Sequence, residues 1–119
     1  MIGKPDLSNV VNNKFQFYMF DNVTNVGLIT KATTINFTAN QWVHVVATRA
    51  NGTIKIYVNA AKEGETAYTN SQYFYPDLYL GGHSTFNRWY FNGAMDDLRI
   101  YNRGLSEAEI QAIYNAEKL

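Results

Sequence analysis

The stretch Tyr90–Tyr114, YFNGAMDDLRIYNRGLSEAEIQAIY, contains the signals that decide how this chain folds. Its first part alternates apolar and polar residues and predicts a long strand over residues 91–102. The turn-forming residues 102–104, Asn-Arg-Gly, end that strand. Ser106 then supplies a helix N-cap, and Glu109 three residues later completes a capping box. We therefore expect one strand, a tight corner and one short helix.

The predicted helix presents an apolar stripe. Ile110, Ile113 and Tyr114 recur at spacings of three and four, so they share one face. Leu105 precedes the cap and is placed to form a hydrophobic staple with Ile110. Because so short a helix is marginal alone, we expect it to dock on a sheet.

The rest of the chain indicates short strands separated by turns. We expect strands at residues 15–20, 26–30, 33–37, 41–49, 53–59, 62–68 and 78–81. Residues 41–49 are apolar on both faces, which predicts a central, covered strand. Asn51-Gly52 predicts a tight hairpin. In the following strand, alternation places Ile56 and its same-face neighbours inward and Tyr57 outward.

Composition limits the domain count and the partners. A chain of 119 residues forms one domain, which we assign to residues 15–119, with residues 1–14 as a flexible lead-in. Ten basic residues balance ten acidic ones, and this balance disfavours nucleic-acid binding. No apolar run is long enough for membrane insertion, and the start of this chain shows no signal-peptide core.

Three motifs resemble a known family. They are FNGAMDDLRIYNR with LS, EI and Tyr114 in the closing stretch, QWVHVVAT at residues 41–48, and IKIYVN at residues 54–59. In this order they are similar to laminin-G-like domains of the concanavalin A-like lectin-glucanase group. Ala60 stands where that family usually has glycine. The resemblance spans about residues 15–119.

This resemblance implies an all-β fold, an antiparallel jelly-roll β-sandwich with one short C-terminal helix. It also implies that the first strands of the family fold are missing here. One of those strands normally pairs with the closing strand, so residues 91–102 would form an open sheet edge. We expect either a homodimer to cover this edge or residues 1–11 to fold back over it.

Catalytic chemistry finds little support in the sequence. Strand alternation aims Asp96 inward with Leu98 and Asp97 outward, so the two carboxylates cannot share one cleft as a hydrolytic pair would. We interpret Asp96 as a buried structural hydrogen-bond acceptor and His44 as a satisfied core residue. The chain has no cysteine and two histidines, too few ligands for a zinc site. No catalytic residue is assigned, and we expect a protein that is not an enzyme.

Aromatic residues in two loops are the best candidates for a binding site. Sugar rings stack on aromatic faces, while amide, carboxylate and imidazole groups bond their hydroxyls. The alternative interpretation is that some of these rings cap the open end of the sandwich, as is expected for Phe74, Phe86 and Tyr90. The predicted ligand-binding residues are Tyr73, Tyr75, His83, Asn87 and Trp89.

Calcium is the one candidate cofactor, because carboxylates and loop carbonyls suffice to bind it. Asp77 and Asn92 are its weakly indicated ligands, and ordinary turn chemistry explains both equally well.

These observations favour a non-catalytic carbohydrate-binding module from a larger secreted or cell-surface protein. The alternative is a structural or protein-interaction domain without sugar binding. The secreted or surface location follows from the family resemblance alone.

Overall fold

The structure, a computed structural model, describes residues 15–19, 28–31, 41–69, 80–81, 90–91 and 93–118. Its elements in chain order are β1 (Gln16–Met19), β2 (Leu28–Lys31), β3 (Val45–Ala50), β4 (Thr53–Val58), β5 (Ala61–Ala67) and α1 (Glu107–Glu117). The strand predicted at residues 33–37 lies outside the described residues. The five described strands and the described helix all fall within or beside segments predicted for them.

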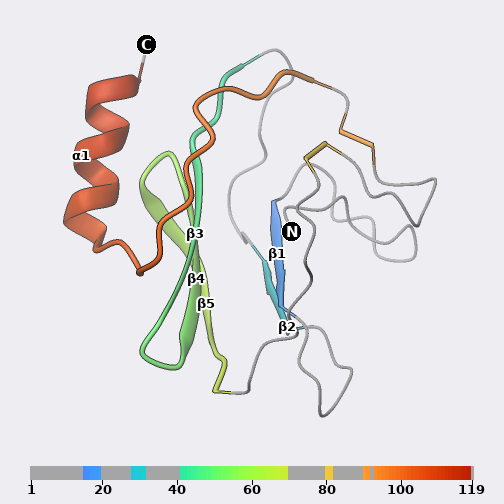
Figure 1. The fold of residues 1–119 in the computed structure, drawn as a ribbon, viewed down its shortest axis with the longest axis vertical. Coiled ribbons are helices and arrows are strands. Elements are labelled where there is room, and N and C mark those ends of the chain that lie inside the picture. Colours follow the sequence, from blue (N-terminus) through green and yellow to red (C-terminus); the bar gives the residue numbers. More distant parts are fainter. Residues whose placement is uncertain are drawn as a thin grey trace.

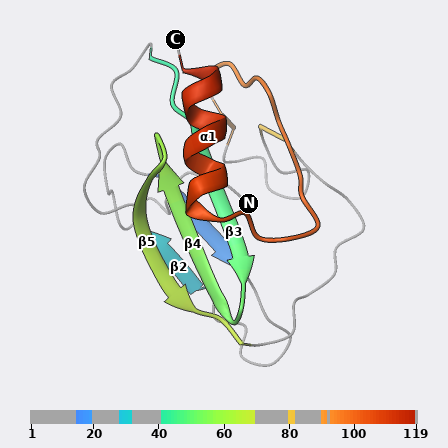
Figure 2. The same cartoon turned by 90° about the vertical axis from the view of Figure 1, so that its left-hand side faces the viewer.

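The described strands form two antiparallel sheets. β1 pairs with β2, and β3, β4 and β5 form a three-stranded sheet in that order. Figures 1 and 2 show three layers, with α1 on one face of the three-stranded sheet and the β1–β2 pair on the other. β2 lies close to both β4 and β5. The protein is therefore β-rich, with one C-terminal helix.

β4 forms the centre of this arrangement because both of its faces are covered. Ile54, Ile56 and Val58 alternate along it and are buried, as predicted. Tyr57 is also buried, at 2% exposure, although it was expected to point outward. It faces α1, and its hydroxyl donates to Glu107 Oε1 at 3.3 Å. The expectation failed because the helix, distant in sequence, covers that second face.

Among the described residues β3 pairs only with β4, so the central position predicted for residues 41–49 stays a prediction. The strand starts only at Val45, and the residues before it are irregular. Trp42, near the start of the segment expected to be covered, is 61% exposed. Burial was predicted because both faces of residues 41–49 are apolar. Among the described residues, however, only β4 pairs with β3.

Two tight turns connect the three-stranded sheet. Asn51 and Gly52 both have positive φ, 50° and 69°, as the predicted primed turn requires. Asn59 and Ala60 form a second such turn, with φ of 49° and 64°. β4 and β5 then pair with an irregularity at Ile56/Tyr57, where β5 carries an extra residue.

The predicted closing strand at residues 91–102 is the main correction to the fold. Its described residues 93–101 contain no strand, and all of them are exposed. Asp97 has φ of 50°, a left-handed conformation that breaks strand alternation. Asp96 is consequently exposed rather than buried, and its Oδ1 accepts from Asp97 N at 2.8 Å. Leu80 and Gly81, expected at the end of a strand, lie in a bend.

The C-terminal helix follows the sequence closely. Ser106 caps it, and the capping box with Glu109 is complete. Ile110 is fully buried, and the stripe continues through the half-buried Ile113 and Tyr114. No helix in the described part of the chain is long and apolar enough to cross a membrane.

Candidate functional site

The candidate site lies where the chain enters and leaves the loop at residues 82–89. Phe91 N donates to Gly81 O at 2.8 Å, so the two ends of the loop are held together. Gly81 has φ of 71°, a conformation that side chains disfavour, while a Cβ there would meet open space. Backbone conformation rather than crowding therefore explains the glycine. The loop that contains three predicted binding residues thus begins and ends at one fixed point.

Two aromatic rings are exposed at this point. Tyr90 is 64% exposed and Phe91 is 49% exposed, and Leu80 beside them is also exposed. Gly93 makes room for one of these rings, because a Cβ on it would lie 2.8 Å from Phe91 Cε1. Exposed aromatic faces of this kind can stack on the apolar face of a ligand ring. Tyr90, expected to cap the sandwich, is instead open to solvent.

The predicted site residues themselves lie outside the described part of the chain. The structure's described residues do not include Tyr73, Tyr75, Asp77, His83, Asn87, Trp89 and Asn92. Their assignment as ligand-binding or calcium-binding residues stays a prediction. What the structure adds is the hydrogen-bonded base at residues 80–81 and 90–91, which flank the predicted loop at residues 82–89.

No cluster of three or more acidic or histidine side chains that could hold a metal occurs among the described residues. Asp96 and Asp97 are adjacent and exposed, and Asp96 bonds locally to the next backbone amide. The acceptor role expected for Asp96 is therefore a local one, filled by the next backbone amide.

His44 lies under the C-terminal end of α1. Its ring centroid is 5.8 Å from that of Tyr114, and its buried Nδ1 has no hydrogen-bond partner among the residues that the structure describes. The expectation of a satisfied core histidine is therefore wrong at this atom. Burial lowers the pKa of His44 below its usual 6.5, Glu117 opposes this shift, and Arg99 adds to it. Arg99 and Glu117 form an ion pair beside the ring.

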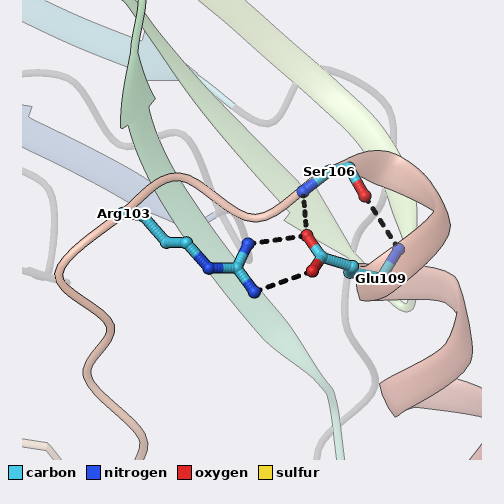
Figure 3. Close-up of polar contacts among 3 residues, drawn as sticks. All are labelled: Arg103, Ser106 and Glu109. Carbon is cyan, nitrogen blue, oxygen red and sulfur yellow. Dashed lines mark hydrogen bonds and ion pairs between the residues drawn. The ribbon is translucent and has the colours of Figure 1, made fainter.

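At the N-terminal cap of α1, an arginine side chain binds a glutamate carboxylate with a geometry that resembles a ligand site. Arg103 donates two hydrogen bonds to the Glu109 carboxylate, at 2.9 and 2.7 Å. Ser106 N also donates to Glu109 Oε2 at 2.8 Å, and Figure 3 shows the three residues together. The Arg103 bonds first, and then the Ser106 amide, lower the pKa of Glu109 to about 2. This cluster joins the corner to the helix and is fully partnered.

Sequence reasoning missed a shallow hollow beside the β3–β4 turn. Its volume is about 360 Å³, at the small end for a ligand pocket. The Arg49 guanidinium lies 5.1 Å from the centre of the buried Tyr68 ring that lines it. The sequence contains no motif for it, because Arg49 and Tyr68 meet only when β5 returns past the turn.

The fold is β-rich, with two antiparallel sheets, one capped terminal helix and exposed aromatic side chains at the base of a predicted loop. These features define the general class of the protein. Its sequence matches the Concanavalin A-like lectin/glucanases superfamily over residues 6–111. The chain therefore belongs to this laminin-G-like, concanavalin A-like family, as the three motifs indicated.

One solved structure with a similar fold is an S-layer domain-containing protein from Clostridium thermocellum, with a TM-score of 0.60. The two sequences are 23% identical, and the similarity covers 85% of this chain. It covers 51% of that protein's chain, so this chain spans about half its length. No match to a curated protein was found.

Proposed function

We propose that this chain is a carbohydrate-recognition module that binds sugar at the 82–89 loop and its closed base. The observation that carries the proposal is the exposure of Tyr90 and Phe91 at the point where Gly81 and Phe91 hold the loop together. Trp89 precedes these rings directly, and His83 and Asn87 in the same loop supply groups for sugar hydroxyls. Family membership supports this assignment, since the superfamily is described by its lectins and glucanases.

The proposed action is binding without hydrolysis. Glycoside hydrolysis by two carboxylates needs both to flank one bond, about 5–9.5 Å apart. In the described part of the chain, the adjacent pair Asp96 and Asp97 is exposed, with Asp96 bonded to the local backbone. Support for a binding role comes from the exposed aromatic rings, and the experiment below tests the predicted loop residues at 69–77 and 82–89.

We further propose that the complete domain is a jelly roll and that its parent protein is secreted or attached to the cell surface. The structural similarity to an S-layer domain-containing protein supports the surface location. Calcium bound by Asp77 and Asn92 is part of the same proposal, as an ion that orders the loops around the sugar.

A glycan array followed by calorimetric titration of the best ligand tests the proposal. Removing one stacked ring costs roughly 1–1.5 kcal/mol or more, so we expect Trp89→Ala and Tyr90→Ala each to weaken binding about tenfold. Trp42→Ala is the matched control, because Trp42 is about as exposed as Tyr90 but lies outside both predicted loops. Its affinity should stay unchanged.

Three outcomes contradict parts of the proposal. A blank array contradicts sugar binding and favours the structural or protein-interaction role. Release of reducing sugar from a bound oligosaccharide contradicts the non-catalytic assignment. Equal affinity with calcium and with excess chelator contradicts the role of the ion.

A further inference from the structure

The hollow beside the β3–β4 turn brings together three parts of the chain: the end of β3, the turn itself and the residues that follow β5. Its volume is about 360 Å³. The described residues that line it are Arg49, Ala50, Asn51, Gly52, Tyr68 and Thr69. Figures 1 and 2 place this turn at the end of the sheet away from residues 80–81 and 90–91, the base of the proposed sugar site. The hollow is therefore a separate surface.

The backbone fixes the shape of this hollow. Tyr68 N donates to Gly52 O at 2.7 Å, which holds the residues after β5 against the turn. Asn51 and Gly52 both have the positive φ of a tight turn. Gly104 packs against Ala50, since a Cβ on the glycine would lie 2.7 Å from the Ala50 Cβ. A ligand would thus meet walls that are already formed, and this lowers the entropic cost of binding.

Arg49 is the charged side chain of the described lining. Its guanidinium carbon lies 5.1 Å from the centre of the Tyr68 ring, and Tyr68 is buried. A cation–π contact with a buried ring orients the guanidinium, while Arg49 as a whole is exposed. A guanidinium has five N–H donors in a planar fork, so it can serve several acceptors at once. Two of these donors match the two oxygens of a carboxylate.

The remaining polar groups of the described lining are neutral. The Asn51 amide and the Thr69 hydroxyl can both donate to and accept from ligand hydroxyls, and both residues are exposed. No acidic side chain occurs among the described lining residues. Arg103, in the corner beside Ala50, is paired with Glu109 and adds no net charge. The local chemistry is therefore one cation flanked by neutral hydrogen-bonding groups.

We propose that this hollow binds the carboxylate group of a small, hydroxyl-bearing acid. Arg49 holds the carboxylate through its planar fork, and Asn51 and Thr69 bond the hydroxyls. An acidic sugar and an aliphatic dicarboxylate both carry the anionic group, but only the sugar also uses the two neutral side chains. The proposal is independent of sugar binding at the 82–89 loop.

NMR titration tests the proposal through the backbone amides of Asn51, Gly52 and Thr69. Sodium glucuronate should shift these amides saturably, glutarate should do so at higher concentration, and glucose, which has no carboxylate, should leave them unchanged. Arg49→Gln should abolish the glucuronate shifts. Arg49→Lys keeps the charge but loses the planar fork, so it should weaken binding about tenfold. Because Arg49 is exposed, both variants should keep the remaining amide shifts of the folded protein.

Two further variants serve as controls. Lys118→Gln removes a cation that lies 5.7 Å from the centre of another tyrosine ring, that of Tyr114, and should leave glucuronate binding unchanged. Tyr90→Ala, which should weaken the proposed sugar site, should also leave it unchanged. The proposal is overturned if neither carboxylate gives saturable shifts, if Arg49→Gln binds as tightly as the natural chain, or if Lys118→Gln loses as much affinity. Equal affinity for glutarate and glucuronate would support the carboxylate site and contradict the role of Asn51 and Thr69.

Discussion

Ala60 has a backbone conformation that a residue with a side chain disfavours. Its φ of 64° in the β4–β5 turn is a conformation that costs an L-residue about 1 kcal/mol or more. Glycine removes this cost but makes the unfolded chain more flexible, which offsets part of the gain. We expect Ala60→Gly to raise the free energy of unfolding by up to about 1 kcal/mol in urea denaturation. Ala67→Gly in β5 is the control and should lower it; a loss at both positions would contradict the argument.

His44 should make stability depend on pH in a defined direction. Its pKa is lowered in the folded protein, mainly by burial against α1, so folding favours the neutral ring. Its contribution is complete above the unfolded pKa of about 6.5 and is lost as the pH falls below that value. The groups near the ring include Tyr114, Glu117 and Arg99, and the last two form an ion pair with each other.

We therefore expect the free energy of unfolding to decrease between pH 7 and pH 5, and His44→Phe to remove that part of the decrease. NMR titration of the ring should give a pKa for His44 below 6.5. His83→Gln, at the other histidine of the chain, is the matched control and should keep the slope that His44 produces. A pKa for His44 above 6.5 would reverse the sign and refute the argument.

At the scale of the elements, the helix depends on its first turn. Ser106 Oγ accepts from Glu109 N at 3.2 Å, and the Glu109 carboxylate accepts from Ser106 N in return. Removing the hydroxyl leaves one amide of the first turn without its partner. We expect Ser106→Ala to cost about 1 kcal/mol, measured by thermal unfolding followed at 222 nm. Ser106→Thr keeps an acceptor and should cost much less; equal losses would show that the side-chain bond is not the cause.

The elements also show which parts of the fold local sequence can predict. The capping box, the Asn51-Gly52 turn and the buried alternation of β4 depend on neighbours a few residues away, and the structure confirms all three. Tyr57 and Asp96 were predicted wrongly because their burial depends on segments more than thirty residues away or on a break at the next residue. Alternation predicts which side chains share a face, but only packing decides whether that face is covered.

The candidate site was also predictable only in part from local sequence. Its residue types, an aromatic run beside His83 and Asn87, were visible in the sequence. The pairing of Gly81 with Phe91 was not, because a loop of eight residues can close in many ways without a sequence signal. The exposure of Tyr90 likewise depends on how the closing segment leaves the loop.

At the scale of the whole molecule, β4 connects all three layers and should make them unfold together. Its Ile56 side chain lies on the face away from α1, whereas Tyr57 contacts the helix, so one strand belongs to both interfaces. A substitution on either side should therefore destabilise both. Ile56→Val removes one methylene from the buried face and should cost about 0.5–1.5 kcal/mol. Ala112→Gly, at an exposed helix position, should cost about 1 kcal/mol.

For each variant we expect urea transitions followed by helix signal at 222 nm and by near-ultraviolet signal from the buried Tyr57 and Tyr68 to coincide. Both midpoints should shift by the same amount, even though Ile56 does not face the helix and Ala112 does not face the sheet. The two transitions coincide only if α1 separates from the sheet at the same time as β4 loses its contacts with the other strands. If Ala112→Gly moves the 222 nm transition alone, the helix is instead an independent unit resting on a sheet that is stable without it.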